Sequence, residues 1–149
     1  MSDDQLEKEL LRFARHPLFA EIPPQLRGWT LEIEWYEPRL WSIKRELVPV
    51  AIEDLRWHFH LPWWRDNDGR CFRTTPAQVI ADPGSSPVNA QRIASSDLAY
   101  PIYVISRRGR LLILDGVHRL AKADLLGSES IDAIVLTSGD IELFAVPTA

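Results

Sequence analysis

Five consecutive residues, Asp115-Gly116-Val117-His118-Arg119, have the types and spacing to hold a phosphate group. They follow an apolar run at 110–114 and begin an amphipathic stretch that ends at Gly127, which predicts a strand, a turn and a short helix. The first turn of a helix carries unpaired backbone N–H groups and the positive end of the helix dipole, and both attract anions. The segment therefore predicts an anion site at the start of a helix.

The side chains of this turn suit phosphate chemistry in different ways. Gly116 lets the backbone turn sharply and lets a ligand approach closely. Arg119 offers a planar fork of donors, and His118 donates to a phosphate or transfers a proton near neutral pH. Val117 belongs to the same phosphate-binding turn. Asp115 as a helix cap, Arg119 as a surface ion pair and His118 as a turn residue form the alternative, and the residues alone leave both interpretations open.

Two acidic residues, Glu53 and Asp54, end an apolar stretch at 47–55 and are candidates for a catalytic acid. A carboxylate there acts as a general base toward a substrate hydroxyl or helps to hold Mg²⁺. The competing interpretation is that both side chains are solvated or cap the next turn. Asp115 is a second candidate for a contact with a metal ion or a ribose.

The aromatic segment 57–64 contains two further candidates, His58 and His60, which share a side if the segment is extended. A third metal ligand is not evident, so packing against the neighbouring rings is favoured over a metal site. Trp63 and Trp64 are alternatively one wall of a substrate pocket, because aromatic rings stack on bases without needing hydrogen-bond partners.

Several elements must position these residues. The spacing of apolar residues predicts a first helix, capped by Ser2 or Asp3 and ended by Pro17. Alternation of apolar and polar residues at 29–36 and 40–47 predicts a hairpin around Glu37, with a helix after Glu37 as the alternative. Thr75 and Gln78 stand at capping-box spacing. A second helix is expected from Ser86-Pro87 to about Ser95. The runs 101–105 and 110–114 predict a hairpin whose turn exposes Arg107 and Arg108, and 131–136 predicts a last strand.

Composition narrows the class of protein. With 149 residues, of which 46% are hydrophobic, the chain can bury the core of one domain. A net charge of −4 disfavours nucleic acid as the main partner, because such binding rests on Lys and Arg that neutralise phosphates. The sequence has one cysteine, no apolar run that could span a bilayer and no leader-like N-terminus, so a cytoplasmic protein is expected.

The block 101–127 resembles the core of the ParB/sulfiredoxin superfamily, with a proline-led strand, a hairpin and a Gly-x-His-Arg turn that opens an alanine-bearing helix. The resemblance extends in order over residues 47 to 137. It implies a compact α+β fold, a mixed sheet with short helices packed on it, at residues 47–149. Residues 1–46 would form an N-terminal helix and hairpin extension. Gly116, His118 and Arg119 would be the phosphate-binding set.

The superfamily includes CTP-dependent partition proteins, ATP-dependent sulfinic acid reductases, free-serine kinases and members described as nucleases. Val117 stands where the reductases have their catalytic cysteine, and no basic helix-turn-helix region follows the last strand. The resemblance therefore implies a small Mg²⁺-dependent phosphotransferase or nucleotide hydrolase that uses ATP, ADP or CTP. A non-catalytic module that responds to a nucleotide or another anion is the first alternative, and a nuclease or DNA-associated protein is the second.

Overall fold

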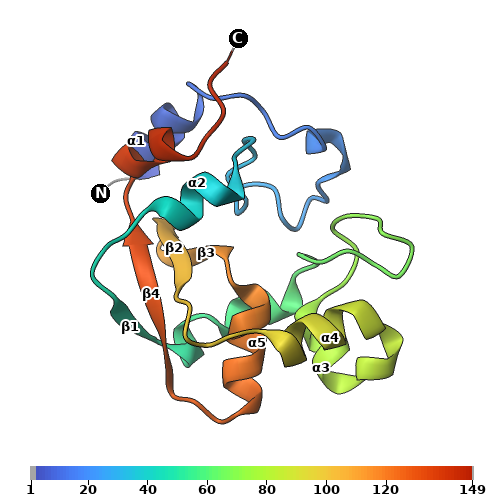
Figure 1. The fold of residues 1–149 in the computed structure, drawn as a ribbon. Coiled ribbons are helices and arrows are strands. Elements are labelled where there is room, and N and C mark those ends of the chain that lie inside the picture. The colour runs from blue at the N-terminus through green and yellow to red at the C-terminus, as the bar shows by residue number, and fades with distance from the viewer. Residues whose placement is uncertain (1–2, 149) are drawn as a thin grey trace.

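The computed structural model describes residues 3–148, which are built around a four-stranded mixed sheet (Figure 1). In spatial order the strands are β1 (Val48–Ala51), β4 (Ser130–Leu136), β2 (Ile102–Arg107) and β3 (Arg110–Asp115). β1 and β3 are antiparallel to their neighbours, whereas β2 and β4 run parallel to each other. The α+β class is confirmed, and so are the predicted hairpin and the last strand.

Each face of the sheet has its own core, because successive side chains of a strand point to opposite faces. In β2, Ile102 and Val104 belong to one buried cluster, and Tyr103 and Ile105 belong to the other. Both faces are therefore covered, and the turn after β3 lies where the two covering layers meet.

Three helices cover the first face: α3 (Pro76–Ala81), α4 (Pro87–Ser95) and α5 (Val117–Leu125) (Figure 1). All three confirm the sequence-based expectation. The capping box predicted before α3 is present, since the Thr75 hydroxyl accepts a hydrogen bond from the Gln78 N–H and the Gln78 side chain accepts one from the Thr75 N–H.

The N-terminal segment covers the other face together with the C-terminal residues, which lie beside α1 in Figure 1. It contains α1 (Asp3–Leu10) and α2 (Glu37–Ser42). The hairpin expected around Glu37 is wrong, because Pro38 takes the first turn of α2, where a missing N–H costs nothing. Residues 29–36 instead make isolated bridges, from Ile33 to Arg15 and from Trp35 to Ala145.

Two smaller expectations about this segment also change. α1 ends at Leu10 rather than at Pro17, and the cap expected at Ser2 lies outside the described residues. Arg107 is not solvated: its side chain is 4% exposed and donates to the Thr30 carbonyl oxygen at 2.8 Å and to the Glu7 carboxylate at 2.9 Å. The β2–β3 turn is therefore tied to the N-terminal segment.

None of the helices within residues 3–148 is long and apolar enough to cross a membrane.

Candidate functional site

Gly116 brings the start of α5 into close contact with β2. Its φ is +122°, and a Cβ at this position would lie 2.4 Å from Cγ2 of Ile102. Any other residue would both strain the backbone and push the helix away from the strand. The glycine of the predicted phosphate-binding turn is therefore required by the packing of α5 itself.

The first N–H groups of α5 are available to a ligand. Gly116 is the N-cap and contributes no side-chain cap, and the first N–H bonded to it is that of Leu120, at 2.9 Å from the Gly116 oxygen. Within the described residues, no hydrogen bond is formed by the N–H groups of Val117, His118 or Arg119. The helix has nine residues, so these donors add to a helix dipole that favours an anion.

Arg119 and Asp115 form an ion pair across this turn, with Nη2 at 2.6 Å from Oδ2. Arg119 also donates from Nη1 to the Pro101 carbonyl oxygen, and Asp115 Oδ2 also accepts from Nε1 of Trp41 at 3.0 Å. Asp115 therefore does not cap α5, and the alternative role of Arg119 as an ion-pair partner is present. These bonds fix the guanidinium plane beside the turn.

Hydrogen bonds also fix the tautomer of His118. Asn89 donates from Nδ2 to the carbonyl oxygen of Arg65 at 2.9 Å, and a carbonyl oxygen can only accept. The Asn89 amide oxygen must then be the atom that lies 3.0 Å from His118 Nε2. His118 therefore carries its proton on Nε2 and keeps Nδ1 as an acceptor.

The surroundings of His118 keep its ring neutral. Burial, helped by the positive charges of Arg92 and Arg119, lowers the pKa of His118 to about 3. The ring stacks on Trp64 with centroids 4.0 Å apart and planes 7° apart. At neutral pH, His118 thus offers a hydrogen-bond acceptor in a fixed orientation rather than a cation.

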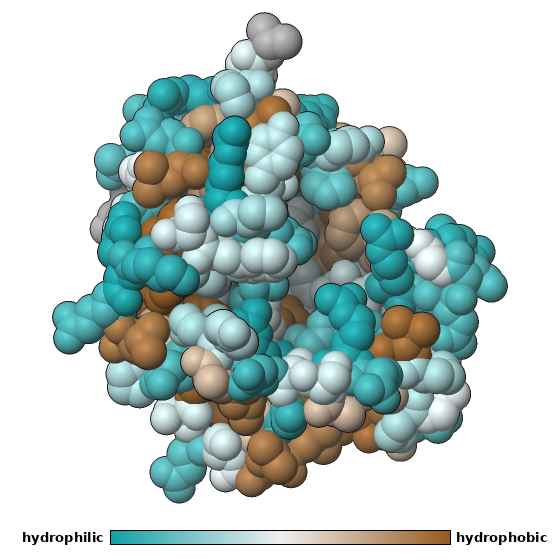
Figure 2. Space-filling model, in the orientation of Figure 1, coloured by the Kyte–Doolittle hydropathy of each residue, from teal (hydrophilic) through white to brown (hydrophobic). Residues whose placement is uncertain are grey.

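A cavity of about 310 Å³ opens in front of the turn, between the N-terminal segment and the helical layer. The face drawn in Figure 2 is recessed between these two parts of the molecule. All the predicted pocket and turn residues except Arg119 line this cavity, namely Trp63, Trp64, Asp115, Gly116, Val117 and His118. Its volume lies within the range of small-molecule sites.

A second hollow, of about 230 Å³, lies on the other side of the same turn. Arg119 lines it together with Ser95 and Ser96 of the α4 end. Four residues line both hollows: Arg92, Asp115, Gly116 and His118. The turn therefore separates two spaces that are both open to a ligand.

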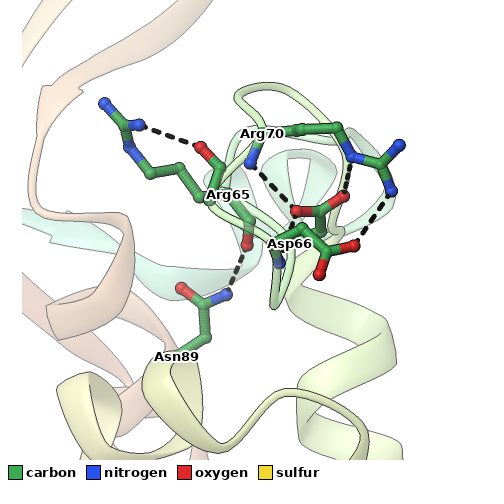
Figure 3. Close-up of polar contacts among 6 residues, drawn as sticks. Arg65, Asp66, Arg70 and Asn89 are labelled. Atoms are coloured by element: carbon green, nitrogen blue, oxygen red, sulfur yellow. Dashed lines mark hydrogen bonds and ion pairs between the residues drawn. The ribbon is translucent and has the colours of Figure 1, made fainter.

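Arg65 lines the larger cavity, and Figure 3 shows how the loop at 65–70 that it begins is held. Oδ1 of Asp66 accepts from the N–H of Arg70 at 2.9 Å, and the Arg70 side chain returns to Oδ2 at 2.8 Å. Asn89 attaches this loop to α4 through the Arg65 carbonyl oxygen. The same amide thus orients His118 and anchors the cavity wall.

Two residues with strained backbone and one unpaired hydroxyl also line the cavity. Glu32 and Phe72 both have positive φ values, 61° and 59°, which side-chain-bearing residues rarely adopt. Thr30 also lines the cavity, and its buried hydroxyl has no hydrogen-bond partner within the described residues. Such features concentrate at functional sites, where a ligand satisfies what the fold leaves open.

Arg92 and Asn89 belong to the candidate site, and the sequence analysis missed both of them. They are three residues apart and therefore share a face of α4. Asn89 is buried, but the sequence around it does not show this, and its role becomes clear only from its hydrogen bond with His118. The Arg92 guanidinium forms no ion pair or hydrogen bond within residues 3–148, although it lines both hollows.

Glu53 and Asp54 lie away from the turn. Glu53 lines a different hollow with Arg56, Asp124 and Gly127, at the far end of α5. A nine-residue helix is about 13 Å long, so neither carboxylate is placed to act on a ligand at Gly116. The catalytic role predicted for these two acids has no geometric support.

His58, one of the two histidines of the aromatic segment, has a structural role. Residues 56–60 form a 3₁₀ turn, not an extended strand, so His58 is fully buried while His60 is exposed. His58 Nδ1 donates to the Leu55 carbonyl oxygen at 2.8 Å, and Nε2 accepts from the Ile113 N–H at 3.0 Å. Both ring nitrogens are therefore occupied, and the packing interpretation is confirmed by the ring contacts of His58 with Trp57 and Trp63.

No group of three or more His, Cys, Asp or Glu residues in the described part of the chain is arranged to hold a metal ion. Comparisons with protein-family models, with curated proteins and with solved structures found no match to this chain.

Proposed function

We propose that this chain is a nucleotide-phosphate-binding protein of the ParB/sulfiredoxin kind that transfers a terminal phosphoryl group. The nucleotide phosphates would lie on the N-terminus of α5, and the acceptor, a small hydroxyl compound or water, would enter the 310 Å³ cavity. The observation that carries this proposal is the position of the turn between two hollows that share Arg92, Asp115, Gly116 and His118. A group bound there is reachable from both sides.

Backbone and side-chain donors around the turn would bind the phosphate groups together. The free N–H groups of 117–119 and the unpaired Arg92 would hold phosphate oxygens, because these are the donors that no other group uses. Arg119, held by Asp115 and Pro101, would present its remaining N–H groups in a fixed plane. Binding would therefore meet donors that are already in place.

His118 would receive the acceptor's proton. In the transfer, the bond from the terminal phosphorus to the nucleotide oxygen breaks, a bond to the acceptor oxygen forms, and the hydroxyl proton passes to Nδ1 of His118. A bound phosphate favours the protonated ring, so the pKa of His118 would rise from its low value when the nucleotide binds. The base would thus become effective only with the nucleotide present.

Mg²⁺ fits this arrangement through Asp115. Proteins commonly hold Mg²⁺ with one or two carboxylates and the substrate phosphates, so a three-residue cluster is not required. Asp115 uses Oδ2 for its two hydrogen bonds, and Oδ1 has none within the described residues. The ion would neutralise charge on the phosphates.

A non-catalytic nucleotide-responsive module is the second candidate. It is favoured by the placement of Glu53 and Asp54 away from the turn, which leaves no acidic residue predicted as a base at the reacting centre. In that case the nucleotide would bind at the same turn without being converted.

Titration calorimetry with ATP, CTP and ADP, with and without Mg²⁺, tests the proposal. Arg92→Ala should weaken nucleotide binding at least tenfold, because a charge-assisted bond to phosphate is lost. Arg56→Ala is the matched control at the other end of α5, where Arg56 pairs with Asp124 at 3.0 Å, and should leave binding unchanged. Binding without product formation would favour the module, and no binding of any nucleotide would contradict both functions.

A further inference from the structure

A fourth hollow, of about 400 Å³, lies beside the predicted phosphate site and is not used by the function proposed above. Three aromatic residues and two cationic ones form most of it: Trp41, Tyr100, Tyr103, Lys44 and Arg119. Ser96, Asp97 and Pro101 complete the wall. We refer to this space as the aromatic cleft.

Two large rings in the aromatic cleft remain accessible to solvent. Trp41 is 46% exposed and Tyr100 is 66% exposed. They come from distant parts of the chain, from α2 and from the loop before β2. Rings that face solvent in one concave space are suited to hold a flat ligand by stacking.

The ring of Trp41 is held in place without a ligand. Its Nε1 donates to Asp115 Oδ2 at 3.0 Å, and its carbonyl oxygen accepts from the hydroxyl of Tyr103 at 3.1 Å. Asp115 in turn pairs with Arg119 at the start of α5. The stacking surface and the phosphate-binding turn are therefore positioned by the same carboxylate.

The aromatic cleft adjoins the hollow at the α5 N-terminus. Ser96 and Arg119 line both spaces. Lys44 adds a cationic ammonium group that has no partner within the described residues. A ligand that extends from the turn into the cleft would thus meet phosphate donors first and aromatic rings next.

We infer that the aromatic cleft binds the base of the nucleotide, with Trp41 and Tyr100 as the stacking residues. This inference rests on the proposed function, because it takes the phosphates to lie on the α5 N-terminus. Stacking uses the face of a base and does not read its edge, so ATP and CTP should bind with affinities within a few-fold of each other.

The test compares a nucleotide with a ligand that has phosphates but no base. Calorimetry with ATP and with inorganic tripolyphosphate, both with Mg²⁺, is carried out on the wild-type protein, Trp41→Ala and Tyr100→Ala. Each variant should weaken ATP binding about tenfold and change tripolyphosphate binding less than twofold.

Two further variants separate stacking from support of the turn. Trp41→Phe keeps a ring but loses the bond to Asp115, so it should retain most of the ATP affinity if stacking is the role of the residue. Tyr36→Ala removes a similarly exposed ring, 45% accessible, that lies outside the cleft, and should have no effect on ATP.

The outcomes distinguish the two claims. Equal loss of ATP and tripolyphosphate in Trp41→Ala, or no loss of either, would overturn the base site and leave the phosphate site standing. Failure of the wild-type protein to bind tripolyphosphate and ATP alike would overturn the proposed function and the base site together.

Discussion

His58 and His118 both lie against tryptophan rings, but they differ in how many of their ring nitrogens are hydrogen-bonded. Both rings are neutral, and both contact a tryptophan, with centroids 3.8 Å from Trp57 for His58 and 4.0 Å from Trp64 for His118. His58 uses both nitrogens in backbone hydrogen bonds and is 0% exposed. His118 uses one nitrogen, and its ring borders two hollows.

The difference shows that burial and a lowered pKa do not by themselves mark a functional histidine. A histidine whose two nitrogens are satisfied stabilises the fold, whereas one with an open acceptor beside a cavity can act on a ligand. The following predictions test this contrast, beginning with the largest expected effect.

Replacing His58 should damage the fold far more than replacing His118. His58→Ala leaves a cavity and two backbone groups without partners, so the free energy of unfolding should fall by about 3–5 kcal/mol. His118→Ala should cost about 1–2 kcal/mol, because its ring is partly exposed and has one hydrogen bond. Urea denaturation measures both values, and equal losses would contradict the contrast.

The two glycines that flank α5 extend the comparison to the backbone. Gly116→Ala should lower the free energy of unfolding by about 3 kcal/mol, since the new Cβ would meet Ile102 at 2.4 Å. Gly127→Ala is the control at the other end: its φ is +77°, but nothing lies within 4 Å of the added Cβ, so about 1 kcal/mol is expected. Similar losses in thermal or urea unfolding would show that Ile102 yields and that the close approach is not essential.

Acid should destabilise the protein through both neutral histidines, His118 and His58, because each has a lowered pKa. Burial lowers the pKa of His58 to about 4, below the ordinary value of 6.5, so the unfolded chain binds the proton first. The stability due to neutral His58 is complete above pH 6.5 and is lost as the pH falls from 6.5 toward 4, at about 1.4 kcal/mol per pH unit. Urea denaturation of the wild type and of His60→Ala should give the same slope, and a flat profile for the wild type would contradict the buried neutral state.

Several elements of the fold could be predicted from local signals. The turn of Gly116, the capping box of Thr75 and the prolines that begin α3 and α4 act within one or two helical turns, so the sequence shows them directly. The same local signals predicted the strand, turn and helix around Gly116, whereas the position of Trp63 and Trp64 at the same cavity has no local signal.

The features of the fold and of the candidate site that the sequence did not predict depend on contacts between distant residues. Trp41 meets Asp115, which is 74 positions later, and Arg107 meets Thr30 and Glu7, so neither pairing has a local signature. Glu53 and Asp54 looked suitable because they follow a strand, but spacing along the chain does not say which end of α5 that strand approaches.

The smallest predicted effect concerns Asn89, the residue that orients His118 but has no contact with His58. Asn89→Asp places a carboxylate beside Nε2 of His118, and this negative charge should raise the pKa of His118 by at least one unit. The pKa of His58 should not move. Histidine side-chain resonances followed by NMR across pH 3–8 measure both, and a shift in His58 alone would show that the amide does not control His118.

The central claim, that the N-terminus of α5 holds phosphate, is tested most directly by titrating ¹⁵N-labelled protein with Mg²⁺-tripolyphosphate. The account predicts that the amide resonances of Val117, His118 and Arg119 move downfield in a saturable manner, because their free N–H groups become hydrogen-bonded to phosphate oxygens. The amides around Glu53 and Gly127, at the other end of the helix, should not change. Saturable shifts confined to that other end, or none at residues 117–119, would contradict the account.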